Sequence, residues 1–196
     1  FPTVQAIYVL DHGLRVRAAL RQIFGTSDGA ARPADTGTGD APTPDLWSSL
    51  DGWMQSVGRL QALDPVTTEL VRLRGARAHD CRLCRSRRFV QAVRAGADES
   101  FFDQIDDYER SDLSERHKVA LRLCDAMLWN PASFSDGLVE QVHDEYTPAE
   151  SLEVVLDVAR NAANKIAVVF GADAPVVTEG VELYDVDDLG NVLHGA

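Results

Sequence analysis

Two cysteines three positions apart, Cys81 and Cys84, are the residues of this sequence best suited to chemistry. Thiols at this spacing can close a small disulfide ring without moving the rest of a fold, and the thiolate is the nucleophile in such reactions. Glu69 lies twelve residues before Cys81 and offers a carboxylate that could take a proton, directly or through a water. The pattern predicts thiol redox chemistry.

Arginines surround the cysteine pair in a chain that is otherwise acidic. The formal net charge is -12, yet residues 69–94 hold eight arginines against Glu69 and Asp80, a local balance of +6. Positive charge beside a thiol favours the thiolate. The negative charge of the whole chain argues against general binding of nucleic acid or of a membrane surface. The arginine run also fits a solvated helix face or a surface for an acidic partner.

Two other interpretations of the cysteine pair stay open. A zinc site needs two further ligands, which only His79, His117 or Cys124 could supply, and the arginines would oppose a cation. The pair could instead be structural. Cys124 falls on the apolar side of its expected helix and is predicted to be a small core residue. We therefore expect neither a metal nor another cofactor.

Composition bounds the class of protein. The chain has 196 residues, of which 45% are hydrophobic and 26% charged, enough for one substantial core in a soluble protein. Three cysteines are too few, and odd in number, for a secreted disulfide scaffold. No apolar run approaches membrane-spanning length, and residues 1–10 lack the features of a signal peptide. We expect a cytoplasmic protein without a membrane segment.

Nearly all hydrophobic periodicity in the chain is helical, which predicts an all-α fold. We divide it into an N-terminal helix and flexible linker (1–44), a helical domain (45–172) and an extended acidic tail (173–196). The linker itself, 26–44, is rich in Gly, Ala, Pro, Asp and Thr. Helix starts are marked by the capping residues Asp45, Asp64, Ser114 and Thr147.

Two expected helices concern the chemistry directly. Asp80 could cap a helix from Cys81 to about Ala95, which would place the cysteines in the first turn, where the helix dipole stabilises an anion. A second, long helix is expected from Pro148 to Phe170, closed by the glycine that follows.

The stretch Glu-x-x-Arg-x-Arg at 69–74, followed by Cys-x-x-Cys, resembles the carboxymuconolactone decarboxylase and alkylhydroperoxidase D-like (AhpD-like) superfamily. The match covers 45–172 in helix order, including Arg160, Asn161 and Asn164. The resemblance implies a helical fold that assembles into a homo-oligomer. In redox-active members the cysteines reduce a hydroperoxide or disulfide substrate, form a disulfide, and are reduced again by a dithiol reductant.

Position by position, Glu69 matches the relay glutamate of the family, and Cys81 and Cys84 match the redox pair. The resemblance implies that Cys84 attacks peroxide and Cys81 resolves the sulfenic acid, whereas helix position alone favours Cys81 as the more acidic thiol. Leu83 and Arg88 occupy the positions of two relay histidines. Arg88 lies one helical turn after Cys84 and could stabilise its thiolate or hold Glu69 in a bidentate pair.

The sequence thus predicts a thiol-disulfide oxidoreductase with alkylhydroperoxidase- or peroxiredoxin-like activity, in which Glu69 is a base or an orienting carboxylate. One alternative is a non-catalytic or redox-sensing helical oligomer of the same family, and another is a lyase-like enzyme that uses the same pocket. The helix with Trp47 and Trp53 and the acidic tail are candidate contact surfaces for a homo-oligomer.

Overall fold

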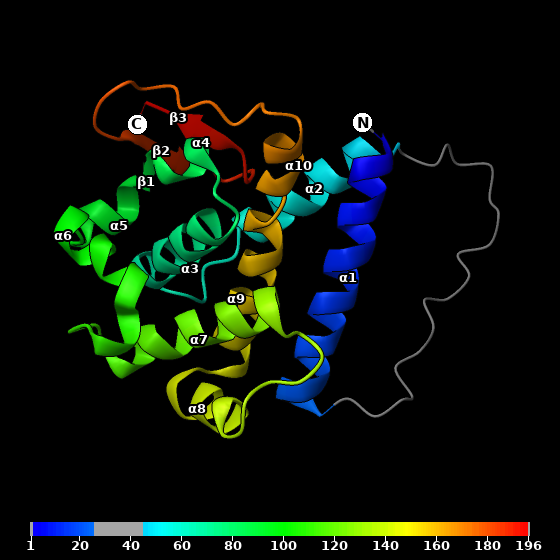
Figure 1. Ribbon diagram of the computed structural model, residues 1–196, viewed down its shortest axis with the longest axis vertical. Coiled ribbons are helices and arrows are strands. Elements are labelled where there is room, and N and C mark those ends of the chain that lie inside the picture. The colour runs from blue at the N-terminus through cyan, green and yellow to red at the C-terminus, as the bar shows by residue number, and fades with distance from the viewer. Residues whose placement is uncertain (1, 26–44, 196) are drawn as a thin grey trace.

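A central helix, α3 (Pro65–Ala78), is surrounded by the other helices, and a small sheet covers one end of the molecule (Figure 1). The computed structural model describes residues 2–25 and 45–195. Around α3 lie α1 (Pro2–Phe24), α2 (Leu46–Gly58), α4 (Arg82–Arg85), α5 (Val90–Arg94), α6 (Glu99–Phe102), the 3₁₀ helix η1 (Asp103–Arg110), α7 (Glu115–Trp129), α8 (Leu138–Glu145), α9 (Pro148–Asn161) and α10 (Asn164–Val169). The predicted all-α class is confirmed; the sheet is an addition to it.

Helix starts follow the capping signals of the sequence. Asp45 accepts a hydrogen bond from the backbone N–H of Ser48, and Asp64 does the same for Thr67 ahead of a proline at the first helical position. Ser114 caps α7, and Thr147 forms a full capping box with Glu150. These contacts are local, so the sequence is sufficient to place them.

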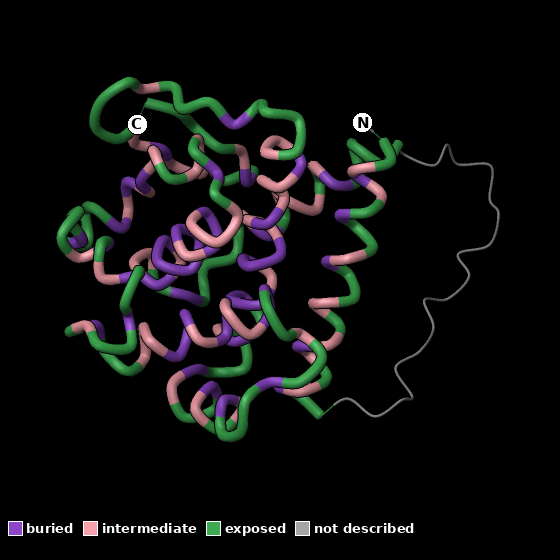
Figure 2. The backbone as a smooth tube through the Cα atoms, in the orientation of Figure 1, coloured by how far each residue is buried: buried purple, intermediate pink, exposed green. Residues whose placement is uncertain are grey.

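The main hydrophobic core lies where α3, α7, α8 and α9 meet α1, and buried residues concentrate along these helices in Figure 2. Cys124 is fully buried in this core, where its sulfur faces the carbonyl of Val71, which confirms its predicted place. A second core beneath α5, α6 and η1 is built around Phe102 and Ile105. Together the two cores hold both faces of α3. None of the described helices combines the length and the apolar character that a membrane span needs.

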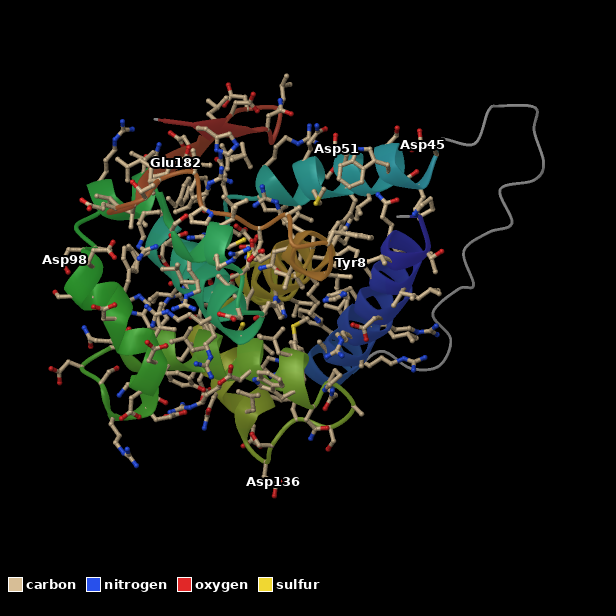
Figure 3. The ribbon with its side chains drawn as sticks, turned by 45° about the horizontal axis from the view of Figure 1, so that its top comes forward. Tyr8, Asp45, Asp51, Asp98, Asp136 and Glu182 are labelled. Carbon is tan, nitrogen blue, oxygen red and sulfur yellow. The ribbon has the colours of Figure 1, made fainter. Side chains whose placement is uncertain are left out.

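The helix α1 is an integral part of the fold. It begins at Pro2, and its Ala19 and Ile23 belong to the main core. Tyr8 lies between α1 and the α9–α10 segment (Figure 3), and its hydroxyl donates to the carbonyl of Ala159 at 2.6 Å. Arg15 donates to two carbonyls at the end of α7. The linker predicted at 26–44 lies outside the described residues.

The helix expected from Cys81 to about Ala95 is wrong. One turn of helix, α4, is followed by the strand β1 (Arg87–Phe89) and then by the short α5. The reason is a long-range pairing: β1 lies parallel to β2 (Glu182–Val186), with Arg87 opposite Glu182. Such pairing depends on residues almost a hundred positions away, which no local pattern reveals.

The single helix expected from Pro148 to Phe170 is also wrong, since α9 ends at Asn161 and α10 begins at Asn164. At the junction the hydrogen bonds tighten to a span of three residues, as in the bond from the N–H of Ala163 to the carbonyl of Arg160. The junction turns α10 toward the cysteine pair.

The C-terminal tail is extended, as expected, and it packs on its own chain. β2 pairs with β1 on one side and antiparallel with β3 (Val192–His194) on the other. The turn between β2 and β3 lies against α2, where Gln55 bonds the side chain of Asn191 at 3.0 Å. Gly190 in this turn has φ +85, a conformation that suits glycine.

We expect Gly190→Ala to loosen the C-terminal hairpin, because an added Cβ would lie 2.0 Å from the carbonyl oxygen of Gln55. Faster hydrogen exchange in β2 and β3 would report the change. Gly195→Ala is the matched control, since Gly195 has a similar φ of +72 with nothing within 4 Å of an added Cβ. Equal effects of the two substitutions would contradict the importance of the contact with α2.

Candidate active site

The end of α3 places the cysteine pair. The N–H of Asp80 bonds the carbonyl of Arg77 and the N–H of Cys81 bonds that of Ala76, the two hydrogen bonds of a Schellman motif. Asp80 occupies the left-handed position of this motif with φ 51, where glycine is usual. The turn directs the chain back across α3, so that Cys81 caps α4 and Cys84 lies at its third residue.

The two thiols are in contact. Both cysteines are free, and their Sγ atoms lie 2.8 Å apart. The N–H of Cys84 also points at the sulfur of Cys81, at 3.4 Å. A disulfide bond is about 2.05 Å long, so closure needs a shift of less than about 1 Å. The geometry predicted from the spacing is therefore present without rearrangement of α4.

The environment separates the two thiols in acidity. The Cys81 thiol donates to Cys84, and this bond, with help from Arg72, Asn164 and Arg87, lowers the pKa of Cys84 to about 6. The same hydrogen bond, followed by burial, raises the pKa of Cys81. Cys81 is also buried, whereas Cys84 is half-buried. At neutral pH, Cys84 is therefore the thiolate and the more accessible sulfur.

A buried ion pair lies directly under the cysteine turn. Arg72 donates two hydrogen bonds of 2.6 Å to the carboxylate of Glu69, which is fully buried. Arg72 also donates to the carbonyls of Cys84 at 2.8 Å and Arg87 at 2.7 Å. Burial opposes the charge of Arg72, but the carboxylate beside it prevails and raises the pKa of the guanidinium. Both carboxylate oxygens of Glu69 therefore accept hydrogen bonds from Arg72.

Two residues of the tail complete the site, and sequence reasoning missed both. Tyr184 on β2 donates to Glu69 at 3.1 Å, and the Arg72 guanidinium lies 5.3 Å from the centre of its ring. Asp173 accepts from the backbone and side chain of Arg82, which fixes the start of α4. No motif marked either residue, because each reaches the site through the fold of the tail.

Arg88 does not occupy the place expected for it. Its guanidinium makes a bidentate pair with Glu99 at 2.6 and 2.8 Å and lies over the ring of Phe102. The expected pair between Arg88 and Glu69 is therefore wrong, and Arg72 takes that position. The reason is β1, which turns Arg88 toward the second core and away from the thiols. The i, i+3 spacing of Glu69 and Arg72 on one helix was the signal that could have found the pair.

His79 is linked to Cys84 by hydrogen bonds through the side chain of Asn164. Nδ1 of His79 lies 2.9 Å from Oδ1 of Asn164, and Nδ2 of Asn164 lies 3.6 Å from the sulfur of Cys84. Burial and the nearby charge of Lys165 lower the pKa of His79 to about 4. The imidazole is therefore neutral at pH 7, and its N–H orients the Asn164 amide so that the NH₂ group faces the sulfur.

Cys84 opens onto a cavity of about 460 Å³. Its lining comes from α2, α3, α4, α9, α10, β1 and the β2–β3 hairpin, and the charged residues in it are Asp51, Arg72, Arg87 and Arg160. Three arginines and one aspartate give the lining a local balance of +2. Within the described ranges, no three metal-binding side chains converge to hold an ion. The site is thus a thiol pair beside a polar, positively charged cavity.

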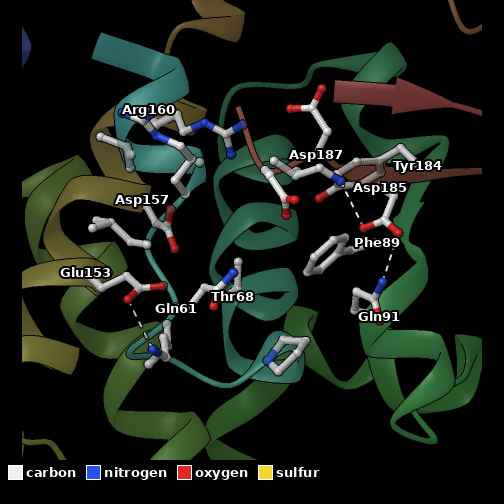
Figure 4. A pocket seen from close by; sticks show the side chains of 18 residues that line it. Gln61, Thr68, Phe89, Gln91, Glu153, Asp157, Arg160, Tyr184, Asp185 and Asp187 are labelled. Atoms are coloured by element: carbon white, nitrogen blue, oxygen red, sulfur yellow. Dashed lines mark hydrogen bonds between the residues drawn. The ribbon is translucent and has the colours of Figure 1, made fainter. Parts of the chain in front are cut away.

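A second cavity of about 460 Å³ lies on the other side of Arg160 and Tyr184, which line both. Figure 4 shows Glu153 and Asp157 of α9 facing Asp185 and Asp187 across it. Asp157 is buried, one of its carboxylate oxygens has no hydrogen-bond partner, and burial raises its pKa to about 7. In contrast to the thiol cavity, the charged residues that line this one are mainly acidic, five carboxylates against Arg59 and Arg160.

The fold is AhpD-like. A solved structure from Agrobacterium tumefaciens, of a protein of unknown function provisionally described as the antioxidant defence protein AhpD, superposes with a TM-score of 0.54. The alignment covers 69% of this chain and 94% of that one, and 19% of the aligned residues are identical, so the likeness concerns the fold.

Sequence comparison gives the family. The uncharacterized proteins Rv2313c and MT2376, from two strains of Mycobacterium tuberculosis, are each 38% identical to this chain over 196 residues. The alignment spans all of this chain and 69% of each relative, so the chain belongs to the family of these proteins. No protein-family model matches the sequence.

We expect alkylation of Cys84 to follow a titration midpoint near pH 6. Cys81→Ala should raise that midpoint by roughly one to two units, because it removes the S–H donor to the thiolate. Iodoacetamide labelling at a series of pH values, with peptide mass mapping, measures the midpoint.

Neighbouring arginines provide the matched controls for this titration. Arg87→Gln should raise the midpoint, because the Arg87 charge lowers the pKa of Cys84. Arg88→Gln should leave it unchanged, because the Arg88 guanidinium lies over Phe102 in the second core and is not among the charges that lower the pKa of Cys84. A shift with Arg88→Gln and none with Arg87→Gln would contradict this account of the thiolate.

We expect Asp157→Asn to stabilise the protein at alkaline pH. The folded-state pKa of about 7 lies above the ordinary value of 3.8, so the folded protein binds this proton more tightly than the unfolded chain. The stability that the proton provides is complete below pH 4 and is lost as pH rises to about 7, a change of up to about 4 kcal/mol. Urea unfolding at pH 5 and pH 8 should show the gain chiefly at pH 8. The exposed Asp144→Asn serves as control.

Proposed function

We propose that this protein is a thiol-disulfide oxidoreductase that reduces hydroperoxides through Cys84 and Cys81. The observation that carries the proposal is the asymmetry of the pair: a thiolate at Cys84 with a pKa of about 6, open to a cavity, with the protonated thiol of Cys81 at 2.8 Å. A low pKa with solvent access is the combination that reactive cysteines require. The AhpD-like fold supports the same assignment.

The reaction divides the work between the thiols. The Cys84 thiolate attacks the terminal peroxide oxygen; the S–O bond forms, the O–O bond breaks, and the leaving alkoxide takes a proton from solvent in the cavity. Cys81 then attacks the sulfenic sulfur, and its proton leaves with the hydroxyl group as water. The pair is oxidised by two electrons and the peroxide reduced by two. A dithiol reductant restores both thiols by exchange.

Glu69 and Arg72 are positioning residues in this proposal. The Arg72 donors hold the carbonyls of Cys84 and Arg87, and so fix the turn that carries the thiolate. Glu69 and Tyr184 in turn hold Arg72. Arg88 supports this arrangement from the second core through its bonds to the carbonyls of Arg85 and Arg87.

A redox switch without turnover is the second candidate. The observation that favours it is the state of Glu69, which accepts from Arg72 and Tyr184 and so presents no free base to the thiols. In that case oxidation would close the same disulfide, but reduction of peroxide would be slow and stoichiometric. A lyase reaction has no comparable observation in its favour.

We also propose a homo-oligomer. Ile7, Leu10 and Leu14 form an exposed apolar stripe along α1, each more than half exposed. Light scattering with and without Leu10→Glu tests whether this stripe is the contact, in place of the Trp47 helix or the acidic tail.

We expect continuous peroxide consumption when the protein is supplied with a dithiol such as dihydrolipoamide. Cys84→Ser should abolish it, because the attacking sulfur is lost. Cys81→Ser, treated with peroxide before any dithiol is added, should consume one equivalent and retain a sulfenic acid on Cys84 that dimedone traps. Cys124→Ser is the matched control, because this thiol is buried away from the cavity.

The assay separates the two candidates. Turnover with any hydroperoxide and dithiol supports the oxidoreductase. A single stoichiometric oxidation of the pair with every reductant would assign the switch instead. Sulfenic acid on Cys81 in the Cys84→Ser protein would reverse the roles of the two thiols.

A further inference from the structure

Among the arginines that line the cavity in front of Cys84, Arg160 is the one without an acidic partner within ion-pair distance in the described part of the chain. Arg72 is paired with Glu69 and also donates to two carbonyls, and Arg87 is paired with Glu182 at 2.6 Å. Arg160 donates from Nε to the carbonyl of Met54 at 3.0 Å. Its two terminal nitrogens have no hydrogen-bond or ion-pair partner among the described residues.

Nε of Arg160 is held by a hydrogen bond, whereas no described residue bonds its two terminal nitrogens. The bond to Met54 holds Nε against α2, and the guanidinium lies close to Gly58, where an added Cβ would come within 2.8 Å of one terminal nitrogen. The absence of a side chain at Gly58 therefore leaves room for the guanidinium. A planar cation that is held in place with two free N–H₂ groups matches the geometry of a carboxylate.

The surroundings direct an anion to the thiol side of Arg160. The thiol cavity has three arginines against Asp51, and Asn161 and Asn164 add amide groups. The adjoining cavity carries Glu153 and Asp157 on α9, Asp185 on β2 and Asp187 just after β2 (Figure 4). Its acidic lining repels an anion. A ligand carboxylate bound to Arg160 therefore lies in the same cavity as Cys84.

We propose that the oxidant reduced by Cys84 is an anion, a hydroperoxide or disulfide that carries a carboxylate, and that Arg160 binds this carboxylate. The proposal rests on the function proposed above, in which Cys84 is the attacking thiol. With a hydroperoxide the step is the one already given: the S–O bond forms, the O–O bond breaks, and the alkoxide is protonated from solvent. With a disulfide, the Cys84 thiolate forms a mixed disulfide and expels the other half as its thiolate, and Cys81 then releases the second half as the protein disulfide closes.

A pair of alkylating agents tests the charge preference without any need for turnover. Iodoacetate and iodoacetamide react with Cys84 in the same way, by formation of an S–C bond and loss of iodide, and differ in the negative charge of iodoacetate. We expect Arg160→Gln to lower the rate ratio of iodoacetate to iodoacetamide at Cys84 roughly three- to tenfold. The rate with iodoacetamide should stay within about twofold of the parent protein.

Two matched variants separate an effect of the Arg160 charge from loss of the contact with Met54 and from the general field of the protein. Arg160→Lys keeps the charge and should retain most of the ratio, even if the contact with Met54 weakens. Arg59→Gln removes the same charge from an exposed residue that lines the acidic cavity alone, and should leave the ratio unchanged. Equal effects of Arg59→Gln and Arg160→Gln would mean that only the general field of the protein acts, and would overturn the proposal.

The decisive comparison uses the substrate class itself. The hydroperoxide of a short-chain fatty acid should have a higher kcat/KM than that of its methyl ester, and Arg160→Gln should remove the difference through KM. An unchanged alkylation ratio in Arg160→Gln, with Cys84 still reactive at neutral pH, would overturn the role of Arg160 and leave the thiol chemistry intact. An unreactive Cys84 in the parent protein would instead refute the proposed function.

Discussion

The buried pair of Glu69 and Arg72 is the interaction on which the site depends. A guanidinium inside a protein must be paired and fully hydrogen-bonded, and Arg72 meets this requirement by joining three parts of the chain. It holds Glu69 on its own helix, the carbonyls of the cysteine turn and of β1, and lies against the ring of Tyr184 from the tail. The contacts of the Arg72 guanidinium thus connect α3, the cysteine turn and the C-terminal sheet.

The contact between the two thiols makes them unequal. The hydrogen bond from Cys81, with the charge of Arg72 and the amide of Asn164, lowers the pKa of Cys84, whereas the same bond, followed by burial, raises the pKa of Cys81. Two chemically identical side chains therefore differ in protonation, and the protonated one stabilises the other through its hydrogen bond. This division requires no long helix dipole, since α4 is a single turn.

The β2–β3 hairpin forms one wall of the cavity in front of Cys84. Without β2 and β3, Cys84 would face solvent; with them, Tyr184, Gly190 and Asn191 form the far wall of its cavity. The contact of Gly190 with Gln55 is too close for any side chain, so the hairpin has one way to lie on α2. The β2–β3 hairpin thus bounds access to the thiol.

The two adjoining cavities are opposite in charge although they share Arg160 and Tyr184. The residues of α9 contribute to this contrast: Arg160 lines both cavities, Asn161 lines the thiol cavity alone, and Glu153 and Asp157 line the other. The burial of Asp157 without a full set of partners carries a cost in stability. The separation of charge leaves Cys84 in the cavity with the positively charged lining.

The sequence by itself determined what is local: the helical class, the caps at Asp45, Asp64, Ser114 and Thr147, the core place of Cys124, and the proximity of Cys81 to Cys84. Each follows from residues within a few positions of one another, where backbone geometry fixes the contact. The tertiary structure alone decided the rest. Arg88 leaves the thiols because β1 pairs with β2, and Tyr184 and Asp173 reach the site because the tail returns to α3 and α4. Pairing between distant segments depends on how whole faces pack, and no local spacing encodes that.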